Sequence, residues 1–228
     1  MNRSRISQEL EIVREIMKKL AVVMVIWLIM AVAIGAMGCS GKTSPTPTPE
    51  PTIPPDFTTY TDDAGIFSIS YPQDWEAPLW MLTDLEQSAE DYVSSVNSDL
   101  SVENSHILFF AGRPIGNYWN PNINIGVEPK PSGLWTLDKV LEGEIKGIKS
   151  VITDSQELSR VKTTVGGKEA VILEWEGTIP NMGKVHDLQM FLLKGKTIWS
   201  LTCTATPENY GDSEDTFYDI LHSFRILK

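Results

Sequence analysis

The chain has 228 residues, of which 42% are hydrophobic and 21% are charged, and its formal net charge at pH 7 is −11. This acidity repels nucleic acid and anionic lipid headgroups, so nucleic acid is excluded as a partner. The chain has two cysteines, Cys39 near the N-terminus and Cys203 in a strand pattern. No disulfide within the C-terminal part is therefore expected, and we interpret Cys203 as a buried structural thiol.

An uncharged apolar run spans residues 20–37 and follows Lys18 and Lys19. Its length is about the minimum for a helix that crosses a bilayer. We therefore predict a cytoplasmic segment at residues 1–19 and a signal or transmembrane segment at 20–38. The remainder of the chain is expected on the extracytoplasmic side of the cell membrane.

Two interpretations of this anchor remain open. In the first, Ala36-Met37-Gly38-Cys39 is a lipobox, the preceding segment is removed and Cys39 carries the lipid, although Met37 fits the motif imperfectly. In the second, the helix stays uncleaved and the basic residues before it remain inside. Cys39 would then be an incidental residue at the end of a helix. Both interpretations place the rest of the chain outside.

A segment rich in proline and threonine follows Cys39, so residues 39–56 are predicted to form an extended, semi-rigid linker. Residues 57–228 have the size of one domain. This domain begins with two short strands around Asp62-Asp63-Ala64-Gly65, and the second strand should bury Phe67, Ile69 and Tyr71. A helix is then expected over residues 78–104.

Strands are predicted at residues 106–111 and 122–127, the first central in a sheet and the second half-exposed. Thr136 is a favourable N-cap for a helix over 137–149 with one apolar stripe. Four strands joined by tight turns should form an antiparallel meander, and a final helix is expected near 210–224. The strands lie at 156–165, 169–176, 185–193 and 197–204. The pattern indicates an α+β fold, a central antiparallel sheet flanked by helices.

No catalytic motif stands out among these elements: there is no Gly-x-Ser-x-Gly elbow, no phosphate loop and no Gly-x-Gly-x-x-Gly. Glu174 and Glu176 share one face of a strand and are the candidates for paired carboxylates. We prefer to interpret them as the solvated face of the strand, with Trp175 and Leu173 turned into the core. His186 and Asp187 are weak candidates for a surface metal site, because no His-x-x-x-His spacing supports them.

Aromatic residues supply the other candidate site. Most of the tryptophans in the domain are expected in its core. Tyr118 and Trp119 lie in a loop rich in glycine, asparagine and proline, where an exposed aromatic side chain would be a contact point for a partner.

Several segments, taken in order, resemble PsbP-like proteins. They are the strand that ends in Tyr71-Pro72-Gln73-Asp74-Trp75, then Asn122-Ile123-Asn124-Ile125, the paired hairpins, residues 195–205 and the terminal Phe217 with Ser223-Phe224. The resemblance implies an α-β-α sandwich over residues 57–228. Plant and cyanobacterial members are extrinsic subunits or assembly helpers of the oxygen-evolving photosystem, and many bacterial relatives are exported lipoproteins of unassigned role.

The chain also departs from the photosynthetic members of that family. It lacks their thylakoid targeting, and strong acidity replaces the lysine-rich character of the plant protein, so a role at the photosystem is not carried over. We expect a membrane-anchored, extracytoplasmic, non-catalytic protein that binds or helps to assemble an envelope protein complex, without a cofactor. The alternative is a lipoprotein that binds a small molecule or a metal.

Overall fold

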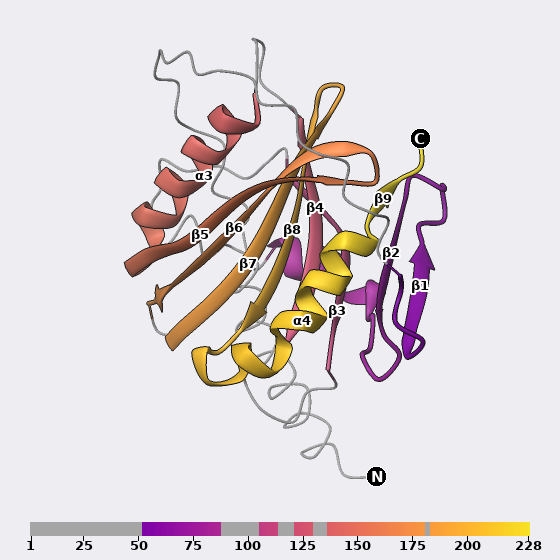
Figure 1. Cartoon of the computed structure of the whole chain (residues 1–228), viewed down its shortest axis with the longest axis horizontal. Coiled ribbons are helices and arrows are strands. Elements are labelled where there is room, and N and C mark those ends of the chain that lie inside the picture. The colour runs from indigo at the N-terminus through magenta and orange to yellow at the C-terminus, as the bar shows by residue number, and fades with distance from the viewer. Residues whose placement is uncertain (1–51, 88–104, 114–120, 130–135, 181–182) are drawn as a thin grey trace, which may run out of the picture.

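The computed structural model describes residues 52–87, 105–113, 121–129, 136–180 and 183–228. Within these ranges the chain forms two antiparallel sheets with helices beside them (Figure 1). The larger sheet has six strands in the order β3-β4-β8-β7-β6-β5, and the smaller has three in the order β1-β2-β9. The expected α+β class with a large antiparallel sheet is confirmed.

The smaller sheet begins the described part of the domain. Strands β1 (Phe57–Thr61) and β2 (Phe67–Pro72) form the predicted hairpin, and β9 (Arg225–Ile226) pairs with the other edge of β2. The three residues of β2 that were predicted to face inward are buried. A hydrogen bond joins this sheet to the end of the last helix: the Ser223 hydroxyl accepts from the Ser70 amide at 2.9 Å.

The larger sheet contains the predicted meander. Its strands are β3 (His106–Gly112), β4 (Asn122–Pro129), β5 (Thr153–Val165), β6 (Lys168–Ile179), β7 (Gly183–Lys194) and β8 (Thr197–Ala205). The turn between β5 and β6 is a two-residue loop in which Gly166 and Gly167 have φ of +55° and +72°. Two positive φ values in succession are what a tight hairpin turn requires, and glycine adopts them without strain.

The positions of β3 and β4 in the larger sheet differ from those predicted from the sequence. We predicted the 106–111 strand to be central and the 122–127 strand to be half-exposed, but β3 is an edge strand and β4 lies between β3 and β8. Asn122 and Asn124 are both buried. Their alternation with isoleucine was interpreted as a solvated face, whereas these amides lie inside the domain.

The helices differ in length and position. Helix α3 (Leu137–Val151) begins at Thr136, whose hydroxyl accepts a hydrogen bond from the Lys139 amide at 3.3 Å, so the predicted N-cap is confirmed. Helix α4 (Pro207–Ser223) is the expected closing helix. Of the helix predicted over residues 78–104, the described part is a 3-10 turn, η2 (Leu79–Met81), with helical residues at 82–87.

Helices α3 and α4 cover opposite faces of the six-stranded sheet. Alternation along β6 shows this, because Ile172 belongs to the core beneath α4 whereas Val171 and Leu173 belong to the core beneath α3. In Figure 1, α4 crosses the near face of the sheet and the smaller sheet lies beside it. Each large apolar side chain buried in this way contributes roughly 1.5–3 kcal/mol. The apolar stripes of the helices therefore fix which face each helix covers.

None of the helices within the described ranges combines the length and apolarity that a bilayer crossing requires. The segment expected at the membrane, residues 20–38, lies outside those ranges, as do Cys39 and most of the linker. The anchor therefore stays a prediction.

Candidate functional site

The face of the larger sheet that is turned toward α3 carries a buried polar surface. Eight residues form it, and we call it the polar face: Asn122, Asn124 and Glu128 of β4, Asp187 and Gln189 of β7, and Ser200, Thr202 and Thr204 of β8. None of them exposes more than 6% of its surface. Burial of so many polar residues is unusual, because such side chains mostly remain in water.

Strand register places these residues in rows across the sheet. Asn122 lies opposite Thr204, which lies opposite Asp187, and the next row contains Asn124, Thr202 and Gln189. Residues directly opposite one another in an antiparallel pair direct their side chains to the same face. The two rows therefore form a continuous polar surface across β4, β8 and β7.

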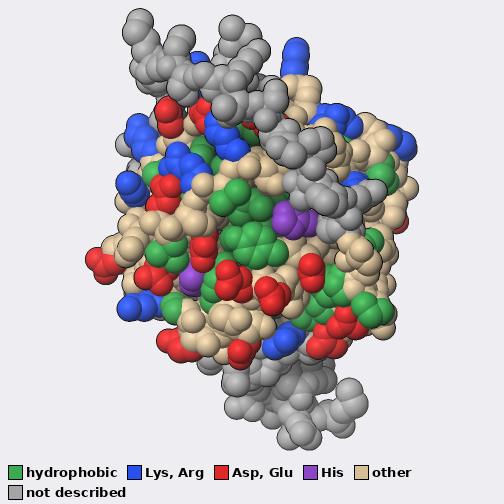
Figure 2. All heavy atoms as spheres, in the orientation of Figure 1, with side chains coloured by type: hydrophobic (Ala, Val, Ile, Leu, Met, Phe, Trp, Pro, Cys, Tyr) green, Lys and Arg blue, Asp and Glu red, His purple; other side chains and the backbone are tan. Residues whose placement is uncertain are grey.

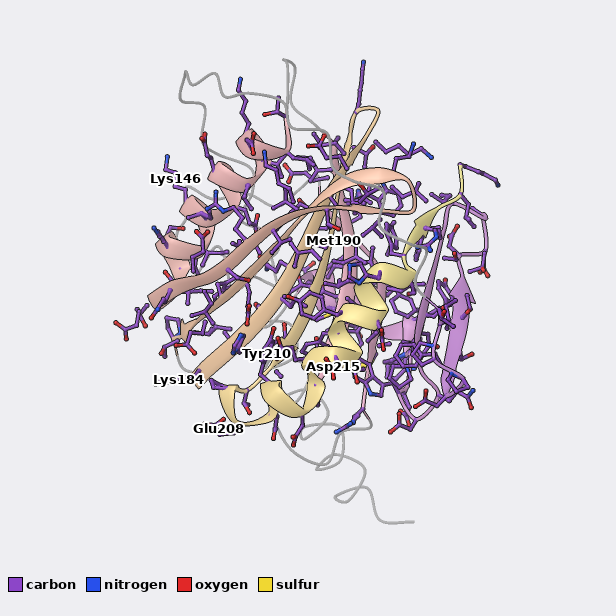
Figure 3. The ribbon with its side chains drawn as sticks, in the orientation of Figure 1. Lys146, Lys184, Met190, Glu208, Tyr210 and Asp215 are labelled. Atoms are coloured by element: carbon purple, nitrogen blue, oxygen red, sulfur yellow. The ribbon has the colours of Figure 1, made fainter. Side chains whose placement is uncertain are left out.

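Helix α3 adds a carboxyl group to this surface. Glu144 lies on the packed side of α3, between the apolar residues Leu141 and Ile148, and is 1% exposed. Lys146, two residues later, is exposed and is labelled beside α3 in Figure 3. The charges of Glu128 and Asp187 both act on the Glu144 carboxyl, which shows that it lies over the polar face.

Few hydrogen bonds satisfy the polar face from within. The Asn124 amide donates to the Thr202 carbonyl at 3.5 Å, and the Gln189 amide donates to the Thr202 hydroxyl at 3.4 Å. Both distances exceed the usual range for such bonds. In the described part of the chain, neither carboxyl oxygen of Glu144 or Asp187 makes a hydrogen bond of normal geometry.

More polar atoms around the same surface lack partners of normal geometry among the described residues. They are one carboxyl oxygen of Glu128, the Gln189 carbonyl oxygen, the hydroxyls of Ser200 and Thr204, and the indole nitrogen of Trp175. A buried polar group without a partner costs about 1–3 kcal/mol. Native domains contain few such groups, so a concentration of them on one surface marks a candidate binding site.

Burial governs the ionisation of the three carboxyl groups. It raises the pKa of Glu128 to about 7 and that of Asp187 to about 8, against the opposing effect of the Thr204 hydroxyl on Asp187. The pKa of Glu144 also lies well above its usual value, first through burial and then through repulsion from Glu128 and Asp187. Near neutral pH these groups therefore hold protons that exposed carboxyls have lost.

The opposite face of the sheet holds a second polar cluster, beneath α4. The Glu174 carboxylate contacts the His186 Nε2 atom at 2.9 Å and accepts a hydrogen bond from the Ser159 hydroxyl, also at 2.9 Å. The Tyr210 ring, from the first turns of α4 (Figure 3), stacks on the imidazole with ring centroids 3.4 Å apart. Burial and the nearby Glu174 raise the pKa of the Tyr210 phenol.

This second cluster has the order serine, glutamate, histidine. In a hydrolytic triad the histidine stands between the nucleophile and the carboxylate and removes the proton of the nucleophile. Here the Ser159 hydroxyl donates to the carboxylate itself, so its proton is directed away from the imidazole. The arrangement favours a structural role, in which Glu174 links β5 and β7 across β6.

The structure separates residues that the sequence pattern had grouped. Glu174 bonds to His186, whereas Glu176 lies opposite His186 in the strand register without forming a pair with Glu174. His186 and Asp187 lie on opposite faces of β7 and do not converge on one ion. Among the described residues, no three histidine, cysteine, aspartate or glutamate side chains are placed to hold a metal.

The other candidate residues have different outcomes. Cys203 is a buried free thiol whose pKa is raised, first by burial and then by Asp187, as expected for a structural cysteine. Tyr118 and Trp119 lie outside the described ranges, so their role stays a prediction. Trp75, Trp175 and Trp199 are buried, but Trp80 of η2 is 74% exposed. Trp80 was not among the contact points predicted from the sequence.

The polar face was not predicted from the sequence. Asn122, Asn124 and the alternation of Ser200, Thr202 and Thr204 with apolar residues were visible, but a half-solvated strand has the same pattern. The residues on the other face of β8 are apolar in either case, so they do not show whether the polar residues face solvent or the interior of the domain. Glu144, a lone carboxylate inside the apolar stripe of a helix, was the one signal that could have revealed the surface.

No family model matches the chain, and no curated protein matches it. Several solved structures are similar in fold. The cyanobacterial PsbP, CyanoP, from Synechocystis sp. has 11% sequence identity and a TM-score of 0.49, with 85% of this chain and 98% of that chain covered. LpqN of Mycobacterium tuberculosis, described as involved in cell envelope biogenesis, has 16% identity and a TM-score of 0.48, with 71% and 83% covered.

The immunity protein TplEi of the T6SS from Pseudomonas aeruginosa has 9% identity and a TM-score of 0.42, with 76% of this chain and 99% of that chain covered. These identities and TM-scores assign neither a family nor an activity to this chain.

Proposed function

We propose that this chain is a non-catalytic, extracytoplasmic binding protein, tethered by its N-terminal segment, whose PsbP-like domain takes a small polar ligand on the polar face. One observation carries the proposal: Glu144, Asp187 and Gln189 are almost fully buried, and their oxygens have no partner of normal geometry among the described residues. The membrane tether rests on the apolar run at residues 20–37.

The energetics favour a ligand at this surface. Each orphaned polar group costs about 1–3 kcal/mol of folding free energy, and a ligand that supplies the missing partners recovers that cost on binding. Binding sites in proteins commonly combine an apolar wall with a few converging polar groups. Here Trp175 and Phe191, from the core beneath α3, border the polar residues of β7.

The cluster around His186 supports the non-catalytic part of the proposal. Glu174 accepts hydrogen bonds from two strands, and the Tyr210 ring covers one side of the imidazole. The side-chain exposure of His186 is 12% and that of Glu174 is 16%. Tyr210 therefore blocks access to that side of the imidazole.

The proposal is tested by thermal unfolding of the full-length chain in a nonionic detergent, with a panel of polyols, sugars, amino acids, amines and divalent metal ions. A ligand that binds only the folded state raises the melting temperature, and the increase grows with the ratio of ligand concentration to Kd. We expect at least one organic compound to raise it, and the Gln189→Leu variant to lose that effect. A panel without effect, or an undiminished effect in the variant, would refute the assignment of the ligand to the polar face.

A second candidate function is favoured by Trp80. Its indole is 74% exposed, and exposed tryptophans are enriched where proteins bind each other. An accessory role in an envelope complex would use this residue, or the loop that holds Tyr118 and Trp119. Crosslinking with mass spectrometry on native membranes tests this role, because one envelope complex recovered in stoichiometric amount would identify the partner.

A further inference from the structure

We propose that the ligand of the polar face is an elongated organic cation with two or more amino groups, of the linear polyamine class. This inference deepens the proposed function and rests on it. The observation behind it is the combination of three buried carboxyl groups, Glu128, Glu144 and Asp187, with unpaired acceptor atoms between them.

The ionisable side chains of this surface are all acids. No ion pair with lysine, arginine or histidine involves any of these three carboxyl groups among the described residues. Lys146 and Lys149 of α3 are both exposed. A bound cation would therefore supply a counter-charge to any carboxyl group that ionises on binding, and its N–H groups would meet atoms that accept hydrogen bonds.

The spacing of the carboxyl groups favours an extended ligand over a compact ion. Glu128 lies opposite Ile198, which lies opposite Leu193, six positions along β7 from Asp187. At about 3.3 Å per residue the two ends of the surface are roughly 20 Å apart. Glu144 interacts with both ends, whereas no three acidic side chains among the described residues converge on a metal-sized site.

The surface between the carboxyl groups suits an aliphatic amine. The Ser200 and Thr204 hydroxyls and the Gln189 carbonyl oxygen can accept N–H groups. Phe191 and Ile198 lie beside them in the apolar core and can contact methylene groups. A chain of amino groups separated by methylenes presents both kinds of surface in alternation.

Binding of such a cation is coupled to proton release. A neutral carboxyl group that pairs with an ammonium group becomes a carboxylate, and its proton passes to the buffer. Each carboxyl group that ionises releases one proton, so the affinity should increase as the pH rises. The titratable groups that act on Glu144 are Glu128 of β4 and Asp187 of β7, and the charge of each raises the pKa of Glu144.

The test is isothermal titration of spermidine into the full-length chain in nonionic detergent, at pH 5.5 and pH 8. Two buffers with different ionisation enthalpies at pH 8 give the number of protons released. We expect tighter binding at pH 8, by tenfold or more, and release of at least one proton. Triacetylated spermidine, which has the same backbone without the charges, should not bind.

Matched variants locate the site. Glu144→Gln removes the buried carboxyl group and should weaken spermidine binding at least tenfold. Glu142→Gln removes an exposed carboxylate from the same helix and should leave the affinity unchanged. Equal weakening in both variants, or none in either, would mean that spermidine senses only the acidic surface and would overturn the inference.

That control matters because acidic side chains gather over α4 on the near face of the molecule (Figure 2). Hydrogen exchange of the wild-type protein locates the bound spermidine without any substitution. Spermidine should slow amide exchange in β4 and β8, and protection confined to α4 would also overturn the inference.

The outcomes distinguish the inference from the proposed function. If a sugar or polyol raises the melting temperature through Gln189 while spermidine does not bind, the function stands and the ligand class is wrong. If neither spermidine nor any organic compound of the panel acts at the polar face, both fail.

Discussion

His186 and Asp187 are consecutive residues of β7, and their side chains lie on opposite faces of the six-stranded sheet. His186 stacks on Tyr210 of α4 and contacts Glu174, whereas Asp187 lies under α3 opposite Thr204. Each face of the sheet therefore holds its own polar cluster. The cluster beneath α4 is paired within itself, whereas on the polar face beneath α3 the Asp187 carboxyl oxygens have no partner of normal geometry among the described residues.

Glu174→Gln tests the structural role of the paired cluster. The carboxylate accepts from Ser159 and contacts His186, and its loss should destabilise the fold by about 1–3 kcal/mol, as expected for a hydrogen-bonded carboxylate with little exposure. Glu176→Gln should change the free energy of unfolding by less than about 0.5 kcal/mol. Urea unfolding of both variants measures the difference. Equal stability of the two would contradict the role of Glu174.

The pH dependence of stability tests the buried carboxyl groups. Because the folded-state pKa of Asp187 is about 8 and its ordinary value is 3.8, the folded state keeps a proton between these pH values that the unfolded state releases. The contribution of Asp187 to stability is therefore full below about pH 4 and is lost as the pH rises toward 8, by up to about 1.4 kcal/mol per pH unit for each such group. Glu144 and Glu128 act in the same direction.

Asp187→Asn removes one of the buried carboxyl groups that keep a proton in the folded state. Urea unfolding at pH 5, 6, 7 and 8 should show a shallower loss of stability in this variant than in the wild type. Asp212→Asn, at an exposed position of α4, should keep the wild-type slope. Equal slopes in the Asp187→Asn variant and the wild type would show that Asp187 does not hold this proton in the folded state.

Trp80→Ala tests the partner surface. Because the indole is 74% exposed, the substitution should change stability by less than about 0.5 kcal/mol, yet it should reduce the capture of an envelope partner in crosslinking. Trp75 is 5% exposed and packs against Phe217, so Trp75→Ala should cost about 3–5 kcal/mol. Undiminished capture by the Trp80 variant would leave the Tyr118 and Trp119 loop as the candidate contact.

The sequence predicted the elements better than the surroundings of their side chains. Hairpin turns, the Thr136 cap and the apolar stripe of α3 are local signals, and the structure confirms each of them. Strand order is set by pairing between distant segments, so the prediction that the strand at 106–111 is central was wrong, and β3 lies at the edge of the sheet. The period-2 pattern of β4 told us that Asn122 and Asn124 share a face, but not that this face lies inside the domain.

The candidate site depended even more on tertiary structure. The polar face is formed by residues of three strands, and helix α3 adds Glu144 to it. Asp187 is recognisable as part of a candidate site only because Thr204 and Glu144 lie near it in the folded chain. Paired carboxylates at Glu174 and Glu176 were an alternative that rested on spacing alone. The strand register places Glu176 opposite His186, but the side-chain hydrogen bond joins His186 to Glu174 instead.

Two glycines provide a matched test of the packing between α3 and the meander. A Cβ atom at Gly177 of β6 would come within 2.5 Å of the Ile152 side chain and 3.1 Å of the Ser155 Cα atom. Because backbone lies on one side, neighbours cannot simply rotate away, and Gly177→Ala should cost about 1–3 kcal/mol.

Gly143 of α3 has nothing within 4 Å of the corresponding position. Since alanine is about 1 kcal/mol more favourable than glycine in a helix interior, Gly143→Ala should stabilise the domain. Thermal unfolding of the two variants should give shifts of opposite sign. A stable Gly177→Ala protein would mean that the chain after α3 leaves the helix along a different path, and the position of Glu144 over the polar face would then need revision.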